Sequence, residues 1–221
     1  MDPMSVRAAC PGNGVRPRSC GLPPYRDRLL GVLFTGVGPE ATSLEDNSNP
    51  DNGSNVMEEK ISVLMVCLGN ICRSPMAEGV FRHILEEEGL SDRISVDSAG
   101  TGSWHVGESP DIRSVRISAS HDVPLTGTAR QVQPEDFKEF DYVLAMDLSN
   151  LDNLERYRAG VGGDAALYLL REFDPEGGPG AEVPDPYYGG PMGFENVYQM
   201  VDRSCRGLLT HILDERGESE G

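Results

Sequence analysis

The sequence predicts an α/β fold, a three-layer sandwich in which a four-stranded, twisted parallel sheet carries helices on both faces. Short apolar segments alternate with helical segments between residues 61 and 212, and this alternation is typical of a parallel sheet covered on both sides. The last segment, from Phe194 to Ile212, keeps apolar residues at every third or fourth position, as an amphipathic helix does. A chain of 221 residues can hold one full core and an additional segment.

A short apolar run, Ile61–Val66, is predicted to form the first, buried strand. A helix is expected soon after it, because Ser74 before Pro75 combines a side-chain cap with proline at the first helical position. Apolar residues then recur at helical spacing, and Gly89 provides a stop. A short loop, Cys67–Arg73, is left between the strand and the helix.

The remaining elements continue the alternation. Segment 171–193 is expected to be a long loop without structure of its own, and such loops in compact domains are usually functional. Asp147 is expected to steady a loop, and Cys205 lies on the apolar stripe of the last helix as a packing residue. The predicted elements are a second strand with Ile94 and Val96, helices over Asp111–Ala119 and Pro134–Phe140, a third strand over Tyr142–Met146, a helix over Ser149–Arg158 capped by Ser149, and a fourth strand over Ala165–Leu170.

The loop Cys67–Arg73 is suited to hold a dianion such as a phosphate group. A strand-to-helix turn aims successive backbone N–H groups at one point, and the helix N-terminus adds roughly half a positive charge. Gly69 avoids a clashing Cβ, and Asn70 tolerates a left-handed backbone. Arg73 adds a guanidinium that can hold two phosphate oxygens. Ligands of parallel sheets bind beyond the carboxyl ends of the strands, and Cys67 lies at such an end.

The same surroundings favour Cys67 as a nucleophile. A thiol that faces a helix N-terminus and an arginine has a lowered pKa, so Cys67 is expected to be a thiolate near neutral pH. The hydroxyl of Ser74 is placed to donate a hydrogen bond to that sulfur. A single cysteine or arginine is more often structural, but Cys-x5-Arg-Ser between a strand and a helix indicates attack on a bound phosphate ester.

Composition and charge limit the partners and compartments of the protein. A formal net charge of −17 argues against nucleic acid as a partner and against a basic membrane-binding surface. No apolar run approaches the length of a membrane span. The five cysteines show neither zinc-ligand spacing nor a small-domain disulfide pattern, and a thiolate nucleophile suits a reducing compartment. We expect a cytoplasmic protein, monomeric or weakly self-associating, without metal or cofactor.

Residues 1–59 are not expected to belong to the fold. Residues 1–35 hold five Arg and two Asp, whereas residues 36–59 hold six acidic residues and no Lys or Arg. The second piece is typical of a disordered linker. The first piece could be a transit peptide, which would direct the chain to a plastid or mitochondrion. The alternatives are a disordered extension and a loosely defined start codon. The sequence thus predicts a domain over 60–216 and an acidic tail over 217–221.

The segment VCLGNICRSPMAE, Val66–Glu78, resembles the signature of the low-molecular-weight protein tyrosine phosphatases. The resemblance extends over about Ile61–Leu213. It implies a flavodoxin-like fold of the phosphotyrosine protein phosphatase I type, and hydrolysis of phosphotyrosine in proteins or of small aryl phosphates. Further matching motifs follow in family order: DSAGT at 97–101, ARQV at 129–132, FDYVLAMD at 140–147, SNL at 149–151 and DPYYG at 185–189.

By this resemblance, Cys67, Arg73 and Asp185 are catalytic. Cleavage of phosphotyrosine releases a phenolate, whose conjugate acid has a pKa near 10, so a proton donor accelerates the reaction. Asp185 matches the family's general acid in DPYYG. Its pKa must be raised for that role, and burial beside Tyr187 and Tyr188 is expected to raise it. Without the cysteine loop, Asp185 between two prolines would simply indicate a turn.

The resemblance also assigns substrate-binding positions. Ile71 favours an aryl phosphate, whereas Thr at that place marks the related protein-arginine phosphatases. Cys72 could form a disulfide with Cys67 under oxidant and protect it from irreversible oxidation. The predicted substrate-binding residues are Leu68, Gly69, Asn70, Ile71, Cys72 and Ser74 of the loop, with Trp104, Tyr187 and Tyr188 beside the substrate ring.

Two features of the sequence concern the residues that would hold the loop Cys67–Arg73 in position. Asp97 and His121 resemble a family pair that braces the phosphate loop from behind, although a lone histidine is equally often a packing residue. Gly127 stands where animal members have a histidine that pairs with the acid at Glu78. The tuning of the thiolate is therefore expected to differ from that of the animal members.

Two other functions share parts of this pattern. A thiol-relay arsenate reductase has the same fold and loop but needs further cysteines downstream, and none occurs between Arg73 and Asp185. A non-catalytic phosphate-binding module would have the loop without a proton donor such as Asp185.

Overall fold

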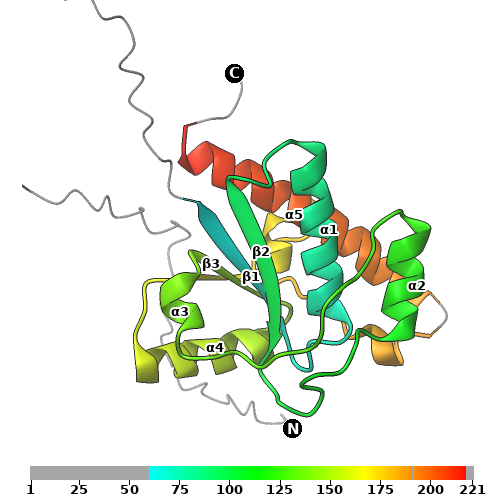
Figure 1. The fold of residues 1–221 in the computed structure, drawn as a ribbon, viewed down its shortest axis with the longest axis horizontal. Helices are drawn as coiled ribbons and strands as arrows, with labels where there is room; N and C mark the ends of the chain where they lie inside the picture. Colours follow the sequence, from blue (N-terminus) through cyan, green and yellow to red (C-terminus); the bar gives the residue numbers. More distant parts are fainter. Residues whose placement is uncertain (1–59, 191, 218–221) are drawn as a thin grey trace, which may run out of the picture. The chain divides into compact units, whose positions relative to one another are not determined.

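A four-stranded parallel sheet forms the centre of the chain (Figure 1). The computed structural model describes residues 60–190 and 192–217, so the predictions for residues 1–59 and for 218–221 lie outside the described residues. The strand order is β2-β1-β3-β4, and the predicted α/β fold class is confirmed. The strands are β1 (Ile61–Cys67), β2 (Ile94–Gly100), β3 (Tyr142–Ala145) and β4 (Ala166–Leu169).

Helices cover both faces of the sheet, as Figure 1 shows. On one face α1 (Arg73–Glu87) and α5 (Gly193–Glu215) pack against each other, with α2 (Ile112–Ser120) beside them. On the other face lie α4 (Leu148–Val161) and the short α3 (Asp136–Glu139). The three layers match those expected from the sequence.

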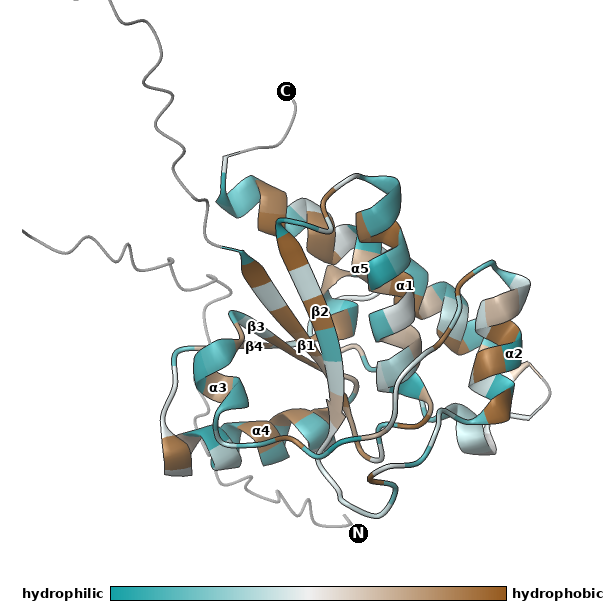
Figure 2. Cartoon of the chain, viewed as in Figure 1, coloured by the Kyte–Doolittle hydropathy of each residue, from teal (hydrophilic) through white to brown (hydrophobic). Residues whose placement is uncertain are grey.

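Strand β1 supplies both cores because its side chains alternate between the two faces. Val63 and Met65 belong to the cluster formed with α1 and α5, and Leu64 and Val66 belong to the cluster with Leu154 of α4. All four are fully buried. A strand buried on both faces needs apolar residues at nearly every position, and Figure 2 shows β1 as hydrophobic over most of its length.

Most predicted boundaries agree with the structure within a few residues, but two predicted caps are wrong. Helix α1 begins at Arg73, and its N-cap residue, Cys72, makes no side-chain capping bond. The Ser74 hydroxyl is turned into the preceding loop instead. Helix α4 is capped by Asp147, whose carboxylate accepts the Asn150 N–H, and not by Ser149.

The loops that follow the strands meet at one edge of the sheet. Cys67 at the end of β1 lies opposite Gly100 at the end of β2, and Val66 lies opposite Ala145 at the end of β3. The segment 171–193 was expected to lack structure, but it contains most of one 3-10 helix, η1 (Leu170–Phe173), and all of a second, η2 (Pro186–Tyr188). In the described part of the chain no helix is long and apolar enough to cross a membrane.

Asp174, just after η1, joins this segment to α5. Its buried carboxylate accepts hydrogen bonds from Arg203, at 3.0 and 3.2 Å, and from Arg171, at 3.2 Å. Burial alone would raise the pKa of Asp174, but the bonds from Arg203, the Glu176 N–H and Arg171 outweigh burial and hold that pKa below its usual value. The ion pairs therefore stabilise the fold only while Asp174 is ionised.

We expect Asp174→Asn to lower the free energy of unfolding by about 3 kcal/mol at neutral pH, the scale for removing one partner of a buried ion pair. A carboxyl whose pKa is lower in the folded state adds stability above its unfolded pKa, about 3.9, and loses that stability as pH falls through the folded pKa. The difference between wild type and variant, measured by urea unfolding, should therefore shrink below about pH 4. Asp152→Asn is the control, because the Asp152–Arg156 pair is exposed and lies within one helix.

Candidate active site

The loop between β1 and α1, residues 67–73, places donors around the sulfur of Cys67. The side chain of Cys67 is buried at the end of β1, with 3% of its surface exposed. The backbone N–H of Asn70 points at its Sγ at 3.2 Å, and the Ser74 hydroxyl lies 3.0 Å from the same sulfur. One backbone N–H and one hydroxyl thus lie within hydrogen-bond distance of the sulfur.

Asn70 holds the loop in shape. Its φ of 54° places it in the left-handed region predicted from the sequence, a conformation that costs of order 1–3 kcal/mol in non-glycine residues. Three bonds from its buried side chain offset that cost. The amide N–H groups donate to the hydroxyls of Ser74 at 2.9 Å and Ser98 at 2.8 Å, and the amide oxygen accepts the Arg130 N–H at 2.8 Å.

These bonds also limit the directions in which the hydroxyl protons can point. The Ser74 oxygen accepts from Asn70, which leaves its proton for the sulfur of Cys67 or, at 3.3 Å, the Ala99 carbonyl. The Ser98 hydroxyl donates to Glu78 at 2.6 Å. The network thus runs from a carboxylate on α1 through Asn70 to the sulfur.

The 67–73 loop is held close to the loop after β2. The N–H groups of Thr101 and Gly102 donate to the carbonyls of Cys67 at 2.9 Å and Leu68 at 2.8 Å. A Cβ on Gly100 would lie 2.9 Å from the Leu68 carbonyl oxygen, too close to be accommodated. A glycine at 100 is therefore required for the two loops to approach each other.

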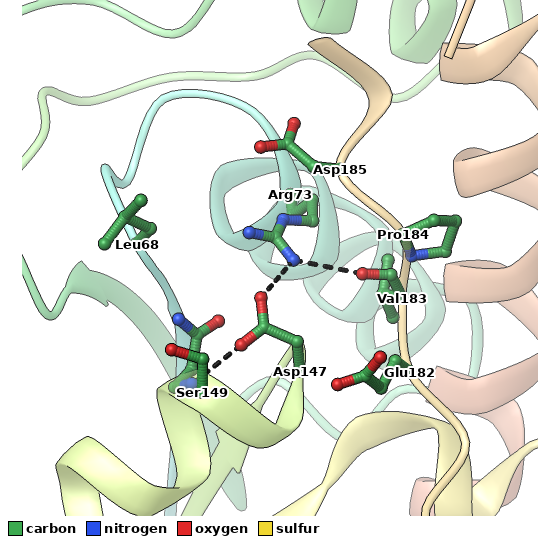
Figure 3. Close-up of a pocket in the computed structure, with 9 residues that line it drawn as sticks. Leu68, Arg73, Asp147, Ser149, Glu182, Val183, Pro184 and Asp185 are labelled. Atoms are coloured by element: carbon green, nitrogen blue, oxygen red, sulfur yellow. Dashed lines mark hydrogen bonds and ion pairs between the residues drawn. The ribbon is translucent and has the colours of Figure 1, made fainter. Parts of the chain in front are cut away.

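Arg73 lines a hollow of about 330 Å³ (Figure 3). Its side chain is almost completely buried, and one guanidinium nitrogen donates to Asp147 at 2.6 Å and to the Val183 carbonyl at 3.0 Å. Asp147 was expected only to steady a loop, yet it contacts Arg73 and caps α4 with the same carboxylate. The hollow is lined by Leu68, Arg73, Asp147, Ser149, Asn150, Glu182, Val183, Pro184 and Asp185.

We expect Asp147→Asn to lower kcat/KM for p-nitrophenyl phosphate about tenfold to a hundredfold. The variant keeps an oxygen to cap α4 but removes the charge that positions Arg73, and small displacements of a binding group have effects of this size. Competitive inhibition by inorganic phosphate should weaken in parallel. An Asp147→Asn protein that unfolds at the wild-type temperature and binds phosphate as tightly as wild type would contradict this role.

Asp185 lines the same hollow as Arg73, on the segment before η2 (Figure 3). One carboxylate oxygen accepts the Tyr187 N–H at 2.9 Å. The expectation that Asp185 is buried beside tyrosines is wrong, because its side chain is exposed. The structure nevertheless brings Asp185 into the lining of one hollow with Arg73 and Leu68, whereas Cys67 is not among the residues that line it.

Two of the predicted substrate-binding side chains are highly exposed aromatic residues, 71% for Trp104 and 54% for Tyr187, and neither is among the residues that line the hollow. Trp104 follows β2, whereas Tyr187 belongs to η2. The guanidinium of Arg113 lies over the Tyr187 ring at 4.7 Å and over the Phe194 ring at 4.6 Å, which holds the tyrosine ring in place. The side chain of Tyr188 lies outside the described part of the chain.

Cys72 and Cys67 are both free thiols. Burial raises the pKa of Cys72 to about 12, and the negative charges of Asp111 and Cys67 add to this shift. Cys72 therefore stays protonated at neutral pH. Cys72 would therefore not supply the thiolate from which the predicted disulfide forms. Cys205 is fully buried in the core, as expected for a packing residue.

The expected brace of Asp97 and His121 is not formed. Asp97 accepts hydrogen bonds from Arg130, and His121 lies 3.1 Å from Glu195 with its ring stacked on Tyr198. His121 is thus a packing residue.

Ser98, Glu78 and Arg82 support the 67–73 loop instead, with Arg82 donating to Glu78. Sequence reasoning missed the roles of Ser98 and Asp147. Asp147 directly follows the predicted third strand, and Ser98 lies near the carboxyl end of the second. Their position at the carboxyl edge of the sheet was the sequence feature that could have indicated these roles.

Comparisons of the sequence with known proteins all identify similar proteins of one family. A family model for the low molecular weight phosphotyrosine protein phosphatases matches residues 62–218. The Schizosaccharomyces pombe low molecular weight phosphotyrosine protein phosphatase is 47% identical over 152 residues, which are 67% of this chain and 95% of the relative. The Homo sapiens protein of the same name is 45% identical over 149 residues, 67% of this chain and 93% of the relative.

Solved structures give the same result. YfkJ from Bacillus subtilis superposes with a TM-score of 0.66 at 42% identity, covering 72% of this chain and 98% of its own. DARP, the drosophila arginine phosphatase, superposes with a TM-score of 0.63 at 36% identity, covering 68% of this chain and 96% of its own. Since the family model spans β1 to α5 and the relatives match over nearly their whole length, this chain belongs to the low molecular weight phosphotyrosine protein phosphatase family.

Proposed function

We propose that this enzyme hydrolyses phosphotyrosine in proteins, and small aryl phosphates, through a cysteinyl-phosphate intermediate on Cys67. The observation that carries the proposal is the convergence of the Asn70 N–H and the Ser74 hydroxyl on one buried sulfur, in the loop that ends at Arg73. The three catalytic residues would be Cys67, Arg73 and Asp185. No metal or cofactor is needed for these steps.

In the first step, the Cys67 thiolate attacks phosphorus and the bond to the phenolic oxygen breaks. Arg73 would hold two of the three non-bridging oxygens, and the backbone N–H groups of the 67–73 loop would hold the third. Asp185 would donate a proton to the leaving oxygen, because a phenolate is a poor leaving group near neutral pH. The products are a neutral phenol and a phosphorylated sulfur.

In the second step, water attacks the phosphorus of the cysteinyl phosphate while the Asp185 carboxylate accepts one of its protons. The sulfur–phosphorus bond breaks, and the sulfur leaves as a thiolate. The Ser74 hydroxyl, 3.0 Å from that sulfur, would stabilise the charge as it appears. Inorganic phosphate then leaves, and Asp185 is protonated again for the next cycle.

The proposed substrate class is an aryl phosphate. Leu68 and Ile71, with Tyr187 and Tyr188, would form apolar walls against a flat ring, and Trp104 would stand at the mouth of the site, where it lines a recess together with Leu68. Ile71 argues against the activity named for the drosophila arginine phosphatase, since the resemblance associates Thr at this position with such enzymes. The remaining loop residues, Gly69, Asn70 and Cys72, would act through the backbone and through the shape of the loop.

The proposal also covers the domain boundaries of the chain and its cellular compartment. We propose that residues 60–216 form the catalytic domain and that residues 1–59 are an extension. A cytoplasmic location fits a thiolate nucleophile. A plastid or mitochondrion is the alternative if residues 1–35 are a transit peptide, and mass spectrometry of the mature N-terminus distinguishes the two.

Alkylation tests the proposal in the full-length wild-type protein. With chelator present, the protein should hydrolyse p-nitrophenyl phosphate, and iodoacetate should abolish turnover in proportion to alkylation of Cys67, mapped by peptide mass spectrometry. Inorganic phosphate should protect that residue. Cys72 and Cys205 serve as internal comparisons, because burial raises the pKa of each. Full turnover by protein whose Cys67 is fully alkylated would exclude the proposed nucleophile.

A further inference from the structure

A second recess shares Leu68 with the Arg73 hollow, and its volume is about 590 Å³. It lies between the loop that follows β2 and the helix α4. Recesses of 300–1,000 Å³ are typical of sites for small ligands and side chains. The recess is lined by Leu68, Thr101, Gly102, Trp104, Gln131, Val132, Asn153, Leu154, Arg156 and Tyr157.

Apolar and aromatic surface faces this recess. Trp104 is 71% exposed, Leu68 46% and Tyr157 40%, so three of the large exposed hydrophobic residues of the described chain gather there. Exposed apolar surface that is gathered in one place marks an interaction site.

The wall is held in position by packing. The indole of Trp104 lies directly on Gly102, where an added Cβ would come within 1.8 Å of the ring. Tyr157 packs edge-on against the buried Phe137, with ring centroids 5.7 Å apart. Trp104 and Tyr157 are therefore supported from behind rather than loosely placed on the surface.

The charge of the recess differs from that of the rest of the chain. Its lining residues include Arg156 and no Asp or Glu, in a chain with 36 acidic and 19 basic residues. The Arg73 hollow, by contrast, is lined by three acidic residues, Asp147, Glu182 and Asp185. The Arg156 guanidinium is already paired with Asp152, which leaves little free charge for an anion.

Leu68 connects the two sites because it lines both. A peptide whose phosphotyrosine enters the Arg73 hollow would pass over Leu68 within a residue or two, since an extended chain advances about 3.3–3.6 Å per residue. The amide side chains of Gln131 and Asn153 offer hydrogen bonds to a passing backbone.

We propose that this recess binds an aromatic side chain of the substrate protein, one to three residues from the phosphotyrosine. The inference rests on the proposed function, because it needs the phosphotyrosine in the Arg73 hollow. An aromatic ring can contact all three kinds of side chain in the recess: the aromatic rings of Trp104 and Tyr157, the aliphatic residues, and the guanidinium of Arg156. A carboxylate would use only the last of these.

The test compares phosphotyrosine heptapeptides with the full-length enzyme. In one series a single Phe is moved through the positions −3 to +3 of an otherwise all-Ala sequence, and in a matched series a single Asp is moved. We expect one or two Phe positions to raise kcat/KM about tenfold, the scale of one well-packed aromatic contact. p-Nitrophenyl phosphate has no flanking residue and reports the Arg73 hollow alone.

Two matched variants of α4 locate the effect. Asn153→Trp fills the recess from an exposed helical position, whereas Glu155→Trp adds the same ring to an exposed position that does not line it. Asn153→Trp should bring the best Phe peptide to within twofold of the all-Ala peptide, and Glu155→Trp should keep the preference. Both should hydrolyse p-nitrophenyl phosphate like wild type. Tyr157→Ala, which removes one wall, should also reduce the preference.

Each other outcome has a distinct meaning. If the wild type does not hydrolyse p-nitrophenyl phosphate, the proposed function fails. If it does, but Phe gives no preference or Asn153→Trp leaves the preference intact, the recess proposal alone is overturned. A preference for Asp that disappears in Arg156→Gln would also overturn it and would assign the recess to an acidic side chain.

Discussion

Cys67→Ser should lower turnover of p-nitrophenyl phosphate by at least about 10⁴-fold, the scale on which removal of a nucleophile acts in enzymes with covalent intermediates. A serine hydroxyl at this position would still receive the Asn70 N–H and the Ser74 hydroxyl bond, so the loop should keep its shape. What is lost is the sulfur nucleophile, because a serine hydroxyl is a far weaker acid than a thiol and does not form an alkoxide near neutral pH.

The control for this variant is ligand binding. Phosphate should stabilise Cys67→Ser against thermal unfolding about as much as it stabilises the wild type, since Arg73 and the loop N–H groups remain. Loss of turnover with retained phosphate binding separates a missing nucleophile from a collapsed site. Turnover within tenfold of wild type would show that the sulfur of Cys67 is not the attacking atom.

The parts of the fold that the sequence predicted well are those set by local patterns. β1 is buried on both faces, so its apolar run is continuous and its limits agree within one residue. The amphipathic stripe of α5 and the left-handed φ of Asn70 are likewise consequences of nearby residues. In each of these cases the controlling interactions lie within a few positions of the chain.

Interactions between distant residues were missed for the opposite reason. Arg73 and Asp147 are 74 positions apart, and so are His121 and Glu195. No local pattern distinguishes the first pair, which belongs to the site, from the second, which only packs helices. Such partners become predictable only once the strand order β2-β1-β3-β4 is known, because β1 and β3 are then neighbours at the carboxyl edge.

The wrong caps have a common physical cause. Ser74 and Ser149 are both good capping residues by type, but a cap needs the side chain to face the first free N–H groups of its helix. Ser74 is fully buried and bonded to Cys67 and Asn70, so it is used by the site instead. At α4 the preceding Asp147 already accepts the Asn150 N–H.

Asp185→Ala should reduce kcat/KM by about 10²–10⁴-fold for phosphotyrosine, the range for loss of a general acid. The loss should be much smaller for p-nitrophenyl phosphate, because p-nitrophenol is a far stronger acid than tyrosine and its anion leaves with little protonation. A series of substituted phenyl phosphates would show this as a steeper dependence of log kcat/KM on the pKa of the leaving phenol in the variant. Equal losses across the series would contradict the role of Asp185 as acid.

The two proposed roles of Asp185 separate because they fall in different steps. The parameter kcat/KM covers events up to formation of the cysteinyl phosphate, where Asp185 acts as acid, whereas kcat also includes attack by water, where it acts as base. Asp185→Ala should therefore lower kcat for every substrate, even where kcat/KM is nearly unchanged. Glu182→Ala is the matched control, since Glu182 lines the same hollow but accepts the Leu148 N–H. Any loss in that variant should be the same for good and poor leaving groups.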